Sequence, residues 1–239
     1  MLSRLGATDP EVLAGPAPGV DVGVGYITPA MPRPGDRVLI TKGAAIEAIA
    51  LFAAAYGDRL ISALGAPTVQ DARDLRAAMT VVPEAQAAAA YGVRDAGVAA
   101  MHDATEGGVL GGLLEIADAS DVGMVVDLAR VPVRPEVAAV CDVAGMDPYS
   151  AISEGTLLLT ARPRHVNGVL RALTEAGVEA AEIGEMLPRT SGRDLVVDGR
   201  TRPLVHPGPN PFWAAFAAWS RIDSCVCARV KLQSLDSGA

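Results

Sequence analysis

The sequence predicts a fold of mixed α/β or α+β class, a mixed sheet packed with helices. Short apolar runs typical of buried strands alternate along the chain with stretches whose apolar residues recur every three or four positions, as in helices. Half of the 239 residues are hydrophobic and only 20% are charged. This composition supplies enough apolar mass for a core and excludes disorder as the main state.

The first predicted elements follow a segment rich in glycine and proline. Val20–Thr28 alternates enough for one strand, and after the turn Pro34-Gly35-Asp36 the run Arg37–Thr41 predicts a second. Apolar spacing of three and four then predicts a helix over residues 43–56. Two or three alanine-rich helical pieces are expected between that helix and Tyr91.

The second half of the chain continues the alternation of strand and helix. Pro135 suits the first position of a helix, and Gly177 is a typical helix stop. The expected elements, in order, are a strand at 98–101, a loop at 102–108, an amphipathic helix at 109–117, a strand at 122–128, a helix at 135–144, a strand at 156–161, a helix at 165–176, strands at 179–186 and 195–197, and a helix at 212–219.

Charge and composition narrow the function classes. The chain carries 28 acidic and 20 basic residues, a net charge of −8, and no lysine and arginine run, which argues against a nucleic-acid partner. The longest stretch without charged residues, 203–220, holds four prolines and makes a poor membrane helix. No secretory signal is visible, and three cysteines make no disulfide framework. We expect a cytoplasmic protein without a membrane partner.

The segment from His102 to Gly108, HDATEGG, is the strongest candidate for chemistry. It lies between an apolar strand and an amphipathic helix, where a glycine pair permits close approach and a helix N-terminus offers N–H groups to an anion. Asp103 and Glu106 would repel a bare phosphate. The functional interpretation therefore requires a Mg²⁺ ion that bridges the two carboxylates to the phosphate oxygens. The alternative is a capping box, with Asp103 as N-cap and Glu106 three residues later.

Two weaker candidates lie elsewhere. Lys42-Gly43 joins a strand to a helix, so that Lys42 and free N–H groups suit a phosphate; the alternative is a solvated lysine beside a glycine that starts a helix. The order of the two residues excludes a P-loop. Glu154, in the turn Ser153-Glu154-Gly155-Thr156, could reach a site at the sheet edge, or belong to a plain turn. The three histidines match no zinc spacing.

The run Met101–Gly108, followed by Gly112–Ala117, closely resembles the C-terminal domain of the AIR synthase-like superfamily. It is most similar to the branch of the hydrogenase expression/formation protein, a carbamoyl dehydratase, and to unassigned AIR synthase-related relatives. Further segments match in the same order, and the resemblance covers about residues 20 to 219. These segments are Pro34–Val38, Thr41–Glu47, Val131–Glu136, Ser153–Leu158 and Ile183–Glu185.

The resemblance implies an ATP-dependent activity, namely phosphoryl transfer to an amide, thioamide or acid-type oxygen with Mg²⁺. It implies a Mg-ATP and substrate cleft between two domains, a small-molecule or protein-bound substrate, and a homodimer. The implied catalytic residues are Asp103 and Glu106, with Asp103 also a metal ligand. The implied cofactor-binding residues are Lys42, Gly43, Thr105, Gly107, Gly108 and Glu154.

Family members also carry an N-terminal ATP-binding domain with paired aspartates. The aspartates of residues 1–33 are Asp9 and Asp21, which are isolated and form no pair. We therefore expect one remnant strand and a linker there, with most of that domain missing. We expect the C-terminal domain over 34–222 and a disordered or anomalous tail over 223–239, which ends in alanine rather than in the cysteine of the dehydratase branch. The sequence thus predicts one wall of the cleft, or alternatively a non-catalytic domain that only binds a ligand or partner.

Overall fold

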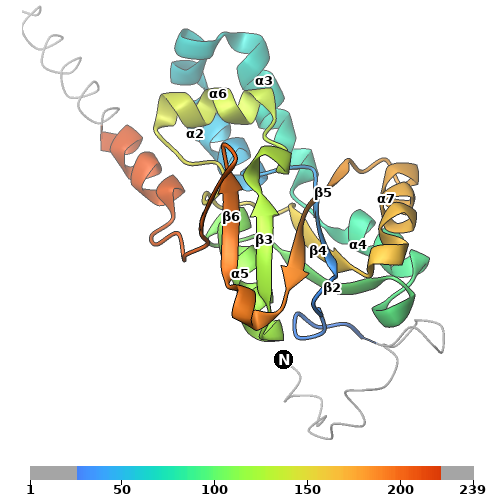
Figure 1. Cartoon of the computed structure of the whole chain (residues 1–239). Helices are drawn as coiled ribbons and strands as arrows, with labels where there is room; N and C mark the ends of the chain where they lie inside the picture. Colours follow the sequence, from blue (N-terminus) through green and yellow to red (C-terminus); the bar gives the residue numbers. More distant parts are fainter. Residues whose placement is uncertain (1–25, 222–239) are drawn as a thin grey trace, which may run out of the picture.

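The computed structural model describes residues 26–221, and its centre is a seven-stranded sheet in the order β2-β4-β1-β5-β3-β6-β7 (Figure 1). All neighbouring strands are antiparallel except β3 and β6, which are parallel. The strands are β1 Arg37–Thr41, β2 Val98–Asp103, β3 Gly123–Asp127, β4 Leu157–Ala161, β5 Ala180–Leu187, β6 Arg193–Val197 and β7 Arg200–Pro203.

Helices cover the sheet and extend beyond one end of it (Figure 1). Pro135 begins its helix, as the sequence predicts, because a missing N–H costs nothing at that position. The principal helices are α2 Ile46–Leu64, α3 Ala66–Asp74, α4 Val82–Tyr91, α5 Gly108–Ser120, α6 Pro135–Ala144, α7 Val166–Glu175 and a last helix at 211–221.

The alternation of side chains along β1 divides the core of the sheet into two faces. Val38 and Ile40 pack into the cluster that includes the apolar stripe of α5, whereas Leu39 packs with residues of α4 and α7. All three side chains are fully buried. Burial on both faces favours apolar residues at successive positions, which explains the run Val38–Ile40.

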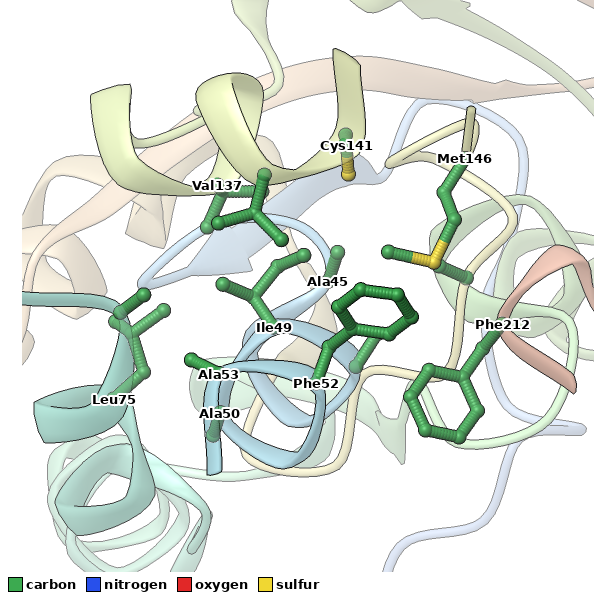
Figure 2. Packing of buried hydrophobic residues seen from close by; sticks show 14 of the residues in the cluster. Ala45, Ile49, Ala50, Phe52, Ala53, Leu75, Val137, Cys141, Met146 and Phe212 are labelled. Atoms are coloured by element: carbon green, nitrogen blue, oxygen red, sulfur yellow. The ribbon is translucent and has the colours of Figure 1, made fainter. Parts of the chain in front are cut away.

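A third cluster lies outside the sheet, where α2 packs against α3, α6 and the helix 211–221 (Figure 2). Phe52 is at its centre, with its ring 4.9 to 6.4 Å from the rings of Tyr56, Phe212, Phe216 and Trp219. The α2 backbone departs from helical geometry at Tyr56, whose hydroxyl donates to the Phe216 carbonyl. These contacts fix the last helix against α2.

The sequence predicted the fold class correctly and most of the elements. The strand β7 was missed, and the loop expected at 102–108 is shorter because β2 continues through Asp103. The strand expected at Val20–Thr28 falls mostly outside the described residues, and residues 26–28 are not in a strand. The expected tail at 223–239 also lies outside them. Within residues 26–221, no helix is long and apolar enough to cross a membrane.

Candidate functional site

The three segments that the sequence singled out converge at one edge of the sheet. Because β4 lies between β1 and β2 and runs antiparallel to both, the ends of those two strands meet the start of β4. Backbone and side-chain hydrogen bonds join them there. Leu157 N donates to Thr41 Oγ1 at 3.1 Å, Thr156 Oγ1 donates to the Gly43 carbonyl at 2.6 Å, and Ala104 N donates to the Thr156 carbonyl at 2.9 Å.

Four carboxylates gather at this junction: Glu47, Asp103, Glu106 and Glu154. Burial raises the pKa of Asp103 above its ordinary value, and the negative charge of Glu154 adds to this, although a hydrogen bond from the Gly155 N–H acts in the opposite sense. Burial also raises the pKa of Glu47. Repulsion from the carboxylates of Glu154, Glu106 and Asp103 raises it further. The Glu154 N–H donates to Glu47 Oε2 at 3.1 Å. The junction is therefore acidic, although the charges of Lys42 and His102 act on Asp103 in the opposite sense.

The Asp103 side chain is the best candidate ligand for a cation. Its Oδ1 atom is buried and has no hydrogen-bond partner among the described residues, which is costly for a carboxylate that no cation neutralises. Carboxylate oxygens suit Mg²⁺, which is commonly held by one or two of them together with water and phosphate oxygens. Within the described chain no group of three or more acidic, histidine or cysteine side chains is arranged to hold a metal. A single free carboxylate oxygen is the kind of donor that a Mg²⁺ ion shared with phosphate takes from a protein.

The Lys42 ammonium is held by the protein itself. It lies 2.5 Å from Glu84 Oε1 and donates to the carbonyls of Ala78 and Thr80 at 3.0 and 2.6 Å. Its side chain is only 11% exposed, so the alternative of a solvated lysine is wrong. Three donors face three acceptors, and Glu84 is 1% exposed, which makes this a buried ion pair. Lys42 thus lies beside the junction, but its ammonium group forms an ion pair with Glu84.

Glycines let the loops of the junction approach one another. Gly107 and Gly108 both have positive φ angles, +76° and +58°, and a Cβ on Gly108 would lie 2.4 Å from the Ala151 carbonyl oxygen. Gly43, at φ +114°, would place a Cβ 2.6 Å from the Pro132 carbonyl oxygen. Whatever their part in binding, Gly43 and Gly108 are required for close backbone packing, and Gly107 is favoured by its positive φ angle.

The helix that follows the HDATEGG loop begins later than a capping box requires. Its N-cap is Gly107, and no side chain caps it, so the interpretation of Asp103 as N-cap is wrong. Asp103 ends β2 instead. Two N–H groups at the start of α5 are already used, since Gly108 N donates to the Thr105 carbonyl and Leu110 N to the Tyr149 carbonyl. Asp103 and the exposed Glu106 are consequently free for a role other than capping.

Sequence reasoning missed three side chains of the junction. Glu47 lies in the first turn of α2, and Glu84 in α4 pairs with Lys42 across 42 positions of the chain, a contact that no local pattern predicts. Asn210 donates from Nδ2 to Glu106 Oε2 at 3.4 Å. The Asn210-Pro211 pair, a common start of a helix, was a signal that could have drawn attention to it.

Residues 33–196 match the family model of the AIR synthase-related protein, C-terminal domain. The chain belongs to the AIR synthase-related family. Among its curated relatives, the carbamoyl dehydratase HypE of Rhodobacter capsulatus is 32% identical over 178 residues, which are 74% of this chain and 47% of that protein. HypE of Escherichia coli is 37% identical over 119 residues, 48% of this chain and 35% of that protein. The chain spans less than half the length of these curated relatives.

Solved structures agree with the family assignment. A crystal structure of HypE from Escherichia coli superposes with a TM-score of 0.62 at 26% identity, covering 80% of this chain and 55% of that one. A HypE solved in complex with ATP gives a TM-score of 0.57 at 21% identity, covering 81% of this chain and 56% of that one. Thiamine-monophosphate kinase from Stenotrophomonas maltophilia gives 0.53 at 18% identity, covering 74% of this chain and 54% of that one. The last two show the shared fold alone.

Proposed function

We propose that this chain supplies the C-terminal-domain wall of an inter-domain cleft for Mg-ATP and substrate, in an ATP-dependent protein of the hydrogenase-maturation type. The observation that carries the proposal is the buried, unpartnered Oδ1 of Asp103 at the point where the three loops meet. Family membership and the HypE relatives support it. The substrate class proposed is a small-molecule or protein-bound amide, thioamide or acid-type oxygen.

In this proposal Asp103 binds the metal through its free oxygen, and Glu106 faces the reacting phosphate from the exposed loop before α5. Mg²⁺ would offset the negative charge that phosphate brings to an acidic site. Gly107, Gly108 and Thr105 would form the loop surface against the nucleotide, with Glu154 opposite. Gly43 and Lys42 would shape the neighbouring turn, where the Lys42–Glu84 ion pair holds the end of β1 in place.

The proposal extends to assembly. A homodimer and a cleft completed by a second domain are proposed, because the chain corresponds to about half of each HypE structure that it matches. A HypE–HypF complex, to which this chain has a TM-score of 0.54 at 20% identity, is an example of a relative with a protein partner. By analogy we propose a protein partner that presents the substrate.

An alternative function is a non-catalytic domain that binds only a ligand or a partner. The occupied Lys42 ammonium favours it, since that group is not available to a phosphate while it bonds Glu84 and two carbonyls. The two functions differ in what they require of the acidic junction. ATP chemistry requires Asp103 and Glu106 to act with Mg²⁺, whereas a simple binding unit does not.

Calorimetric titration of the chain with Mg-ATP, followed by a phosphate-release assay, separates these functions. We expect Mg²⁺-dependent ATP binding that Asp103→Asn weakens at least tenfold, or about 1.4 kcal/mol, and that Glu106→Gln also weakens. Asp71→Asn, at an exposed position of α3, is the control and should bind like the unchanged chain. Equal binding by all four proteins would refute the site, and no Mg²⁺-dependent binding by the unchanged chain would favour the alternative function.

A further inference from the structure

Asn210 is a buried amide that bonds three separate segments of the chain. It is only 9% exposed and immediately precedes the helix 211–221. Its Oδ1 accepts from the N–H of Phe212 at 3.1 Å, as a helix N-cap does, and from the N–H of Ile152 at 3.3 Å. Its Nδ2 donates to Glu106 Oε2 at 3.4 Å. The last helix, the loop before β4 and the loop before α5 therefore share one side chain.

The two backbone donors determine which way the amide faces. An N–H cannot donate to an NH₂ group, so the atom that receives Phe212 N and Ile152 N must be the oxygen. The amide nitrogen then has to point the other way, toward Glu106. The orientation of this donor is consequently set by backbone atoms and does not depend on Glu106 itself.

Glu106, by contrast, has little else to hold it. It is exposed in the turn between β2 and α5, and within residues 26–221 its carboxylate accepts a hydrogen bond from the side chain of Asn210. The carboxylate of Glu106 acts on its neighbours, since its charge is one of those that raise the pKa of Glu47. The position of the Glu106 carboxylate therefore affects the electrostatics of the acidic junction.

We propose that Asn210 is a positioning residue for Glu106: its bond to Oε2 keeps the Glu106 carboxylate at the acidic junction. The helix 211–221 then contributes to the site without touching a ligand, because Phe212 and Trp219 fix it to α2 through Phe52 and Asn210 caps its start. The effect of this positioning on nucleotide binding rests on the proposed function. The positioning of Glu106 by Asn210 does not depend on that function. A carboxylate acceptor makes such a bond stronger than a neutral acceptor would.

The substitution Asn210→Asp tests positioning against simple capping. Aspartate keeps both acceptor bonds and is as good an N-cap as asparagine, so a residue that only caps the helix should tolerate it or gain stability. A positioning residue should not, because a second carboxylate would face Glu106. We expect the melting temperature to fall by roughly 3 °C at pH 8, because like charges in contact repel.

The second substitution, Glu106→Gln, completes the cycle. The amide of the introduced glutamine can donate to the introduced aspartate, so Asn210→Asp should cost nothing in the Glu106→Gln background. Asn167→Asp, at the exposed start of α7, should cost nothing in either background. A melting temperature that Asn210→Asp leaves unchanged, or lowers equally in both backgrounds, would overturn the proposal.

A Mg-ATP titration of the same proteins connects positioning to function. We expect Asn210→Asp to weaken binding at least fivefold, because the displaced Glu106 carboxylate no longer faces the metal-bound phosphate. The double variant should regain stability but not binding, since it lacks the Glu106 carboxylate. If the unchanged chain binds no nucleotide, the proposed function fails, while the melting data still decide whether Asn210 positions Glu106.

Discussion

Replacing Glu47 with glutamine should stabilise the folded chain at neutral pH. Burial raises the pKa of Glu47 above its ordinary value of about 4.5, with repulsion from Glu154, Glu106 and Asp103 adding to the effect. Glutamine removes the charge and keeps an oxygen that accepts the Glu154 N–H, now 3.1 Å from Glu47 Oε2. The substitution therefore removes repulsion at the junction while preserving its geometry.

The stability gained by Glu47→Gln should increase as the pH rises. The unfolded chain releases the Glu47 proton near the ordinary pKa, whereas the folded chain holds it to higher pH. The folded state thus loses stability as pH rises through this window, and above the raised pKa the full cost is present. Below the ordinary pKa both states are protonated, and the cost of the carboxylate disappears.

The size of the gain depends on the burial of Glu47 and on the charges around it. Burial of the carboxylate is the larger cause, and the charges of three other carboxylates add to it. A partly exposed pair of charges contributes roughly 0.2–1 kcal/mol. The hydrogen bond from Glu154 weakens when its acceptor is neutral, which subtracts part of the gain. We expect a net gain of about 1 kcal/mol at pH 8, which raises the melting temperature by roughly 2–4 °C for a domain of this size.

Thermal melts of the unchanged chain and Glu47→Gln at pH 4, 6 and 8, with EDTA present, measure this effect. Asp58→Asn is the matched control, because it removes the same charge from the same helix beside Arg59 and Arg73. It should show no gain. A gain for Glu47→Gln that is equal at pH 4 and pH 8, or equal to that of the control, would refute the reasoning about the acidic junction.

Three further outcomes are expected. Phe52→Ala should lower the free energy of unfolding by roughly 3–5 kcal/mol in urea, since it empties the centre of the aromatic cluster, and a loss below about 1 kcal/mol would contradict that placement. Gly155→Ala should cost clearly more than Gly145→Ala in the same assay; both have positive φ, but only the Cβ at 155 would lie 2.3 Å from the Ala78 carbonyl oxygen. Burial raises the pKa of Cys141 to about 12, so in a background lacking the other two cysteines it should stay unreactive toward a thiol reagent at pH 8 until the chain unfolds, and rapid native-state labelling would disprove its burial.

The spacing of apolar residues along the sequence predicted the strands and helices well where buried positions recur regularly. The middle of β1, Val38–Ile40, is a continuous apolar run because both faces of the strand are covered. The helix α6 begins at Pro135, where local sequence rules place it. The strand β7 was missed because its four residues are all exposed and carry no apolar signal. Its pairing with β6 comes from the hairpin between them, not from burial.

The sequence by itself determined the fold class and which loops hold the acidic and glycine residues, since those depend on spacing along the chain. Only the tertiary structure decided what those residues face: Lys42 meets Glu84 rather than solvent, and Glu106 meets Asn210 across 104 positions. Such contacts follow from strand order, which places the ends of β1 and β2 beside the start of β4. Hydrogen bonds and charge interactions act over a few ångströms of space, and separation along the sequence does not determine that distance.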